Sequence, residues 1–174
     1  IDKPALSALW PNKKGMSVVL DLGANIECSS KNLLDFSIMG ASLYTSLYPN
    51  EKPNVALLNI GSEELKGNEI IKETYQILND KKSNNYNFKG YIEGNELMNG
   101  EVNVIVSDGF TGNVALKTAE GTANFITSEL KKTMSNSILG KISSLLNISN
   151  LRKFKKRLDP RLYNGAIFIG LDSP

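Results

Sequence analysis

Apolar residues along the chain form short β-branched runs that alternate with longer stretches of helical spacing. The short runs predict strands at 5–10, 16–20, 54–60, 86–92, 102–106 and 165–170. In the longer stretches apolar residues recur every three or four positions, which predicts helices over 31–47, 68–79 and 111–133 and a helical turn at 95–98. Strands that alternate with helices are typical of an α/β protein with a parallel sheet and right-handed crossovers.

Three of the predicted strands end in polar turns rich in glycine, asparagine and acidic residues, and each turn opens a helix. The turns begin at Asp21, Asn59 and Asp108. In parallel sheets the carboxyl ends of the strands share one edge, and ligands bind beyond that edge. We therefore expect the three turns to converge on one crevice. The alternative is that their glycines and asparagines serve only to reverse the chain.

The third turn, DGFTGN at 108–113, has the features of an anion site. It leads into a long predicted helix, whose first backbone amides lack intrahelical partners and carry partial positive charge. Thr111 and Asn113 offer side-chain hydrogen bonds, and Lys117 lies one turn further on the face of Asn113. We expect a phosphate or phosphate-like group here. The alternative is a helix-capping turn that binds no ligand.

Composition narrows the class of protein. With 174 residues, 41% hydrophobic and 22% charged, the chain is typical of one globular α/β domain over 1–174. A net charge of +2 and scattered aromatic residues give no reason to expect nucleic acid as a partner. The single cysteine, Cys28, excludes a disulfide within the chain and suits a reducing compartment. A signal peptide and an apolar run of about 18 residues are both absent, which favours a cytoplasmic location.

The chain contains no histidine, and this excludes several kinds of site. Neither a Ser-His-Asp or Cys-His nucleophile nor a histidine-ligated metal site can be built from these residues. Catalysis must therefore use carboxylates, lysine, backbone amides or a substrate that supplies its own nucleophile. The chain begins at Ile1 without methionine and stops at Pro174 just after an apolar run, so we expect it to be part of a longer protein.

Three segments resemble the phosphate acyltransferase (PlsX) family of bacterial phospholipid synthesis. They are DLGAN at 21–25, LLNIGSEELKGNE at 57–69 and SDGFTGNVALKTAEG at 107–121. The similarity covers nearly all of this chain, which corresponds to the middle and later part of a family member. Two departures lie in the second segment: Ser62 stands where the family often has threonine, and Leu65 stands where glycine is common.

The resemblance implies transfer of a fatty acyl group from an acyl-carrier-protein thioester to inorganic phosphate, which gives acyl phosphate for phosphatidic acid synthesis. It implies a Rossmann-like three-layer sandwich similar to the isocitrate/isopropylmalate dehydrogenase fold, assembled as a homodimer, and it requires no metal or other cofactor. This chemistry suits a chain without histidine, because phosphate is already a nucleophile at neutral pH and a thiolate leaves readily. The protein has to hold phosphate against the thioester and stabilise the oxyanion.

We expect Asn113, Lys117 and Lys66 to be catalytic by holding phosphate or the developing charge. Other residues of the turns are expected to bind phosphate or substrate: Asp21, Gly23, Asn25, Asn59, Gly61, Ser62, Glu63, Gly67, Asn68, Asp108, Gly109, Thr111 and Gly112. Among the carboxylates, Asp21 and Asp108 are expected to bond to neighbouring loop amides. Glu63 and Glu64 are expected to cap or pair, because unpaired they would repel phosphate.

The region after the third helix predicts an amphipathic helical hairpin within about 111–160. Its apolar residues are Ile138, Leu139, Ile142, Leu145 and Leu146, and its basic residues include Arg152, Lys153, Lys155 and Lys156. Such segments dock on a partner subunit, lie on an anionic membrane or receive an acidic carrier protein. We expect dimer contact first, and the resemblance adds peripheral membrane contact and acyl-carrier-protein docking. The alternative is a hairpin whose basic residues are simply solvated.

Two other classes of function remain open. One is a metal- and NAD(P)-dependent dehydrogenase of the same fold, or a phosphotransacetylase-like enzyme. The sequence contains neither GxGxxG nor GxxxxGK[ST], which disfavours a standard dinucleotide fingerprint or P-loop. The other class is a non-catalytic module that binds membrane or carrier protein through the basic hairpin.

Overall fold

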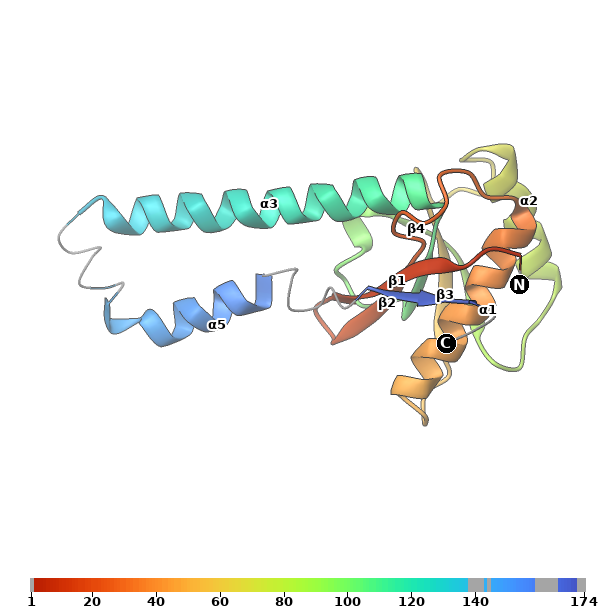
Figure 1. The fold of residues 1–174 in the computed structure, drawn as a ribbon, viewed down its shortest axis with the longest axis horizontal. Coiled ribbons are helices and arrows are strands. Elements are labelled where there is room, and N and C mark those ends of the chain that lie inside the picture. Colours follow the sequence, from red (N-terminus) through yellow and green to blue (C-terminus); the bar gives the residue numbers. More distant parts are fainter. Residues whose placement is uncertain (1, 138–142, 144, 159–165, 172–174) are drawn as a thin grey trace.

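The structure is a computed structural model that describes residues 2–137, 143, 145–158 and 166–171, with only the backbone for 155–158 (Figure 1). Within these residues a six-stranded sheet has the order β4-β3-β5-β2-β1-β6. The strands are β1 (Ala5–Pro11), β2 (Met16–Leu20), β3 (Asn54–Asn59), β4 (Asn87–Glu93), β5 (Val104–Val106) and β6 (Ile167–Ile169). Each lies within two residues of its predicted bounds.

The sheet is mixed, which corrects the prediction of a parallel sheet. The four strands β4, β3, β5 and β2 are mutually parallel, as predicted. In contrast, β1 is antiparallel to both β2 and β6. Only residues 12–15 join β1 to β2, and a parallel pair would require a crossover of about a dozen residues or more. A hydrogen bond from the Asn12 amide to the Gly15 carbonyl, 3.0 Å long, closes this short turn.

Helices cover both faces of the sheet. Helices α1 (Ser30–Leu47) and α2 (Glu69–Asp80) pack on one face, where Phe36 of α1 lies in a core with Leu20, Leu57 and Val106. Helix α3 (Gly109–Ser135) packs its first turns on the other face, against a core that includes Ile105. Neighbouring residues of each central strand are buried on opposite faces, which explains why these strands are almost wholly apolar.

A side-chain cap starts each of these three helices. Ser29 caps α1 in a capping box with Asn32, Asn68 caps α2 and Asp108 caps α3. Such oxygens accept hydrogen bonds from amides that the first helical turn leaves unpaired. The predicted helix starts lie within two residues of the observed ones because these caps are readable in the sequence.

Strand β4 carries one extra residue relative to β3, and this bulge shapes the surface next to α2. Val55 faces Phe88, whereas Leu57 faces Tyr91. The extra residue lets Phe88 and Tyr91 reach the same ring, that of Tyr75 on α2, at centroid distances of 5.5 and 4.8 Å. The Tyr75 hydroxyl thereby reaches the polar turn that follows β3.

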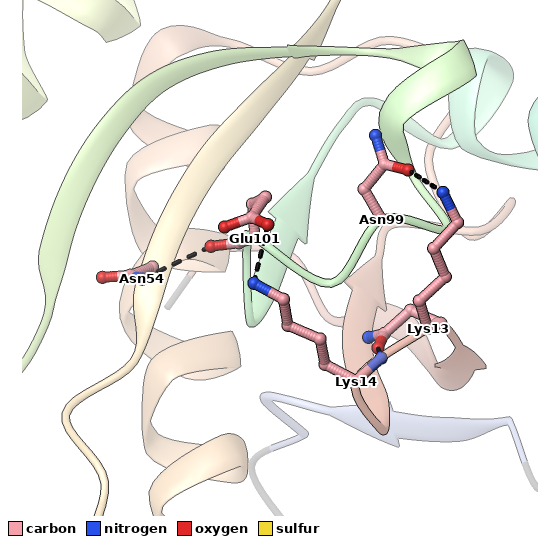
Figure 2. A network of polar contacts seen from close by, with 6 residues as sticks. Lys13, Lys14, Asn54, Asn99 and Glu101 are labelled. Atoms are coloured by element: carbon pink, nitrogen blue, oxygen red, sulfur yellow. Dashed lines mark hydrogen bonds and ion pairs between the residues drawn. The ribbon is translucent and has the colours of Figure 1, made fainter.

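Polar contacts at the opposite end of β3 tie the turn between β1 and β2 to the segment before β5 (Figure 2). Lys13 Nζ donates to Asn99 Oδ1 at 2.9 Å, and Lys14 Nζ pairs with Glu101 Oε1 at 2.6 Å. The neighbouring Lys14 lowers the pKa of Glu101. These side chains are exposed, so the network adds little stability and lies away from the polar turns of the site.

A buried tyrosine lies close to this network. Tyr44 of α1 donates its hydroxyl to Glu51 Oε2 at 2.6 Å and accepts from Asn103 Nδ2 at 2.9 Å. Burial, followed by the bond to Glu51, raises the pKa of Tyr44 to about 12. The tyrosine is therefore neutral in the folded protein at physiological pH.

The second half of α3 extends well beyond the sheet, and α5 (Ile148–Leu158) projects to the same side (Figure 1). This is the region of the predicted hairpin. Ile138, Leu139 and Ile142 of that prediction lie outside the described residues, as do the side chains of Lys155 and Lys156. The hairpin therefore stays a prediction.

Candidate functional site

The three polar turns leave the same edge of the sheet. Strand β5 lies between β3 and β2, and all three run parallel, so their carboxyl ends are neighbours. The turns at 21–25, 59–68 and 107–113 follow directly from these ends. The sheet topology therefore places the three segments side by side.

The first turn is organised around the carboxylate of Asp21, which is fully buried. It accepts five N–H bonds of 2.8 to 3.2 Å, from the amides of Leu6, Gly23, Ala24 and Asn25 and from Asn25 Nδ2. Both oxygens are therefore engaged by the protein. Asp21 shapes the turn and has no free oxygen to offer a substrate.

The start of α3 packs tightly against this first turn. The Gly109 amide donates to the Asn25 carbonyl at 2.7 Å. At Gly112 a Cβ would overlap the Asp21 carbonyl and lie 2.7 Å from Ser107 Oγ, so only glycine fits there. The neighbouring Asn113 lies over Gly23, with its Cγ 3.5 Å from where a Cβ on Gly23 would be. The close packing of α3 on the first turn thus brings the polar side chain of Asn113 next to the backbone of that turn.

Two of the helix amides at this expected anion site already have partners within the chain. Asp108 accepts from the Thr111 amide at 2.7 Å and from the Thr111 hydroxyl at 3.0 Å. The Gly109 amide is taken by Asn25. An anion seated on the axis of α3 would also meet the Asp108 carboxylate. The amides of Gly109 and Thr111 are therefore engaged within the chain.

The second turn is held by Asn59. Its Nδ2 group donates to the carbonyls of Gly61 and Lys66, both at 3.1 Å. Gly67 follows with a φ of 94° and lies directly against the Asn59 side chain. Glu64 accepts a hydrogen bond from the Tyr75 hydroxyl at 3.1 Å.

Several predicted binding residues therefore have structural partners. Asn68 caps α2 through a 2.9 Å bond from the Ile71 amide. Asn25 directs its Nδ2 group to the Pro4 carbonyl and to Asp21 Oδ2, at 2.7 and 2.8 Å. As in Asn59, both Nδ2 hydrogens are used within the chain. Neither asparagine offers a free amide donor in this conformation.

The exposed polar side chains of the turns are the remaining candidates for contact with a substrate. Asn113, Ser62, Glu63 and Lys66 are exposed. Glu63 folds back over Gly61 beside Lys66. Lys117 is also exposed, but its Nζ pairs with Glu120 Oε2 at 3.0 Å. Among the predicted catalytic residues, Asn113 lies beside the first turn, over Gly23.

A cleft of about 710 Å³ lies where the starts of the three helices meet. Its polar lining includes the caps Ser29, Asn68 and Asp108, together with Asn32 and Thr111. Its apolar lining consists of Ile26, Cys28, Leu33, Ile70, Ile71 and Phe110. Burial raises the pKa of the Cys28 thiol. Sequence reasoning missed the apolar lining, although Ile26 directly follows DLGAN and Phe110 lies inside DGFTGN.

The described part of the hairpin region exposes apolar and basic side chains. Leu145 and Leu146 are 70% and 80% exposed, and Arg152 and Lys153 are also exposed. No helix within the described ranges is long and apolar enough to cross a membrane. In the same part of the chain, no three His, Cys, Asp or Glu residues group closely enough to hold a metal ion.

Comparison with known proteins gives the class first. The chain belongs to the family described as "Fatty acid synthesis protein", whose model matches residues 1–174. More particularly, a phosphate acyltransferase from Pelagibacter ubique (strain HTCC1062) is 81% identical over 174 residues, 100% of this chain and 52% of the relative. One from Maricaulis maris (strain MCS10) is 43% identical over 173 residues, 98% of this chain and 49% of the relative. The resemblance to phosphate acyltransferases is thereby confirmed, and the chain spans about half the length of these relatives.

Among solved structures, EutD phosphotransacetylase from Staphylococcus aureus is similar to this chain. The TM-score is 0.53 over 71% of this chain and 43% of that one, at 16% sequence identity. A likeness at this identity concerns the fold alone. The predicted α/β class is confirmed, with a mixed six-stranded sheet and helices.

Proposed function

We propose that the full-length protein transfers a fatty acyl group from an acyl-carrier-protein thioester to inorganic phosphate, and so forms acyl phosphate for phosphatidic acid synthesis. The observation that carries this proposal is the 81% identity to a phosphate acyltransferase over the whole chain. The three adjacent turns at the sheet edge support it, because they hold the segments that resemble that family.

The chemistry needs little acid–base help from the protein. A phosphate oxygen attacks the thioester carbonyl carbon, the resulting oxyanion collapses, and the C–S bond breaks to release a thiolate. Holding the two substrates together and stabilising the oxyanion supply most of the rate enhancement. This agrees with a chain that contains no histidine.

We assign the contact with phosphate to Asn113 and Lys66, and to Ser62 of the same turn as Lys66. Asn113 is exposed and lies over Gly23, while Lys66 makes no ion pair with any described residue. The engaged carboxylates and amides of Asp21, Asn59 and Asp108 hold the three turns in place around them. Lys117 adds positive charge one turn beyond Asn113, where Glu120 balances it.

Replacing Asn113 with alanine in the full-length protein tests this assignment. We expect phosphate-dependent turnover to fall by about tenfold or more, because removal of one donor from a preorganised oxyanion site has effects of at least this size. Turnover is measured as acyl phosphate formed at varied phosphate concentration. Replacing Thr118, an exposed neighbour on the same helix, with alanine is the matched control. Unchanged kinetics of Asn113→Ala would remove this residue from the site.

The finer fold likeness is also a proposal. We place the chain with the isocitrate/isopropylmalate dehydrogenase type of fold, supported by helices on both faces of a sheet with four parallel strands. The second candidate function is the phosphotransacetylase-like enzyme that the sequence leaves open, and EutD adds only that such an enzyme has a similar fold. Activity with coenzyme A thioesters in place of carrier-protein thioesters would favour that candidate.

We propose that the hairpin region contacts a second subunit and an anionic membrane surface, and that its basic side chains receive acyl carrier protein. Two adjacent exposed leucines, Leu145 and Leu146, followed by exposed Arg152 and Lys153, support this.

A liposome flotation assay tests the membrane contact. Changing Leu145 and Leu146 together to glutamine is expected to lower the coefficient for partition onto anionic vesicles by about a hundredfold, because two buried leucines contribute roughly 3 kcal/mol. Changing exposed Leu47 on α1 to glutamine is the control, and flotation should then be preserved. Equal flotation of the double variant and the control would contradict membrane contact at these leucines.

A further inference from the structure

The polar and the apolar residues that line the cleft between the helix starts differ in whether they have partners within the chain. Several of its polar side chains are bonded to their own neighbours: Asp108 to Thr111, Ser29 to Asn32, and Asn68 to the Ile71 amide. Its one ammonium group, that of Lys3, donates to the Glu27 carbonyl at 2.9 Å. Much of the polar lining is therefore bonded within the chain, although the lining also includes the carboxylate of Glu27.

The apolar side chains of the same cleft lack such partners. Ile26 is 74% exposed and Phe110 is 63% exposed, and Ile70 stands beside them with much of its surface open. Leu33 and Ile71 continue this surface into the buried core. Large apolar side chains around a concavity are the usual lining of a site for an apolar ligand.

We infer that this cleft receives the acyl chain of the thioester and that Phe110, with Ile26 and Ile70, determines which chain lengths are accepted. The inference rests on the proposed function, because the occupant is the acyl group that this reaction transfers. Phe110 is the specificity-determining residue, and it takes no part in bond making.

The position of Phe110 relative to Asn113 supports this choice of occupant. The two residues are three apart on α3, so they are neighbours on one face of the helix. A thioester carbonyl beside Asn113 would therefore place the adjoining methylene groups against Phe110 and the mouth of the cleft. A volume of about 710 Å³ lies in the range of pockets that enclose ligands of several hundred daltons.

Chain-length preference in the full-length protein tests the inference. Each methylene that leaves water changes affinity by about fourfold, so the wall against which the chain packs should control the preference. We expect Phe110→Ala to change the ratio of kcat/KM for sixteen-carbon over eight-carbon carrier-protein thioesters by about fivefold or more, with the KM for phosphate unaltered. Leu47→Ala, at the far end of α1, should leave this ratio as in the wild type. A ratio that Phe110→Ala does not alter, even with lower activity on both substrates, would overturn the inference.

A second measurement tests binding in the cleft without relying on turnover. In the full-length Ile26→Cys variant, dodecanoate below its micelle concentration should slow alkylation of the new thiol by about fivefold, while alkylation of a Leu47→Cys variant should be unaffected. Protection without acyl phosphate formation would retain the cleft assignment and reject the proposed reaction. Turnover without protection would reject the cleft assignment alone. A thiol that is unreactive before any ligand is added would show that another part of the full-length chain fills the cleft, which would also overturn the inference.

Discussion

Replacing Gly112 with alanine is expected to lower the free energy of unfolding by about 3 kcal/mol and to abolish most activity, because the added methyl group would overlap backbone rather than a movable side chain. A Cβ at Gly112 would clash with the Asp21 carbonyl oxygen and lie 3.0 Å from the Asp21 carbonyl carbon. The helix can accept the methyl only by moving away from β2, which would separate Asn113 from Gly23. Chemical denaturation and turnover of the full-length protein measure the two effects.

Gly121 provides a matched control on the same helix. A Cβ at Gly121 would meet nothing within 4 Å. Gly121→Ala should therefore raise stability by about 0.5–1 kcal/mol, the usual advantage of alanine over glycine in a helix interior. If Gly112→Ala were as stable as Gly121→Ala, the close packing of α3 on the first turn would be contradicted.

Replacing Asp21 with asparagine is expected to cost about 3 kcal/mol and to reduce activity strongly, because a neutral amide cannot accept the five N–H bonds that the carboxylate accepts. The Nδ2 group of the new side chain would itself face N–H donors in a fully buried site. The turn at 21–25 would lose the carboxylate to which its amides are bonded. The surface against which Asn113 lies would then be lost as well.

Asp108→Asn is the control for stability. Asparagine is as good as aspartate at a helix N-cap, so this change should cost less than about 1 kcal/mol. Both variants remove one carboxylate from the same edge of the sheet. Equal stability losses in the two variants would mean that the five bonds to Asp21 contribute no more to stability than the bonds to Asp108.

Much of the fold follows from local signals in the sequence. The helix caps Ser29, Asn68 and Asp108 and the β-branched run ending at Val106 define where elements begin and end. The general expectation of a parallel sheet missed the antiparallel direction of β1, because it rested on the alternation of strands and helices and not on the length of the connection. Four residues between β1 and β2 permit a hairpin and exclude a parallel crossover.

The candidate site was harder to predict, for a physical reason. Asn25 and Asn59 carry side chains of a kind that often binds ligands, yet both donate their amide hydrogens to groups within the protein. Sequence shows which groups can form hydrogen bonds, but the folded backbone decides whether those bonds go to a ligand or to the loop itself. Conversely, nothing in the sequence sets Phe110 and Ile26 apart from other apolar residues, and only the arrangement of three helix starts reveals that they line a cleft.

The most direct test of the central claim is the product that the full-length protein forms from carrier-protein thioester and radiolabelled phosphate. If the turns at 21–25, 59–68 and 107–113 hold phosphate against a thioester, label should appear in acyl phosphate in step with thiol release, and Asn113→Ala should reduce both together. Thiol release without labelled acyl phosphate, at any phosphate concentration, would contradict the claim.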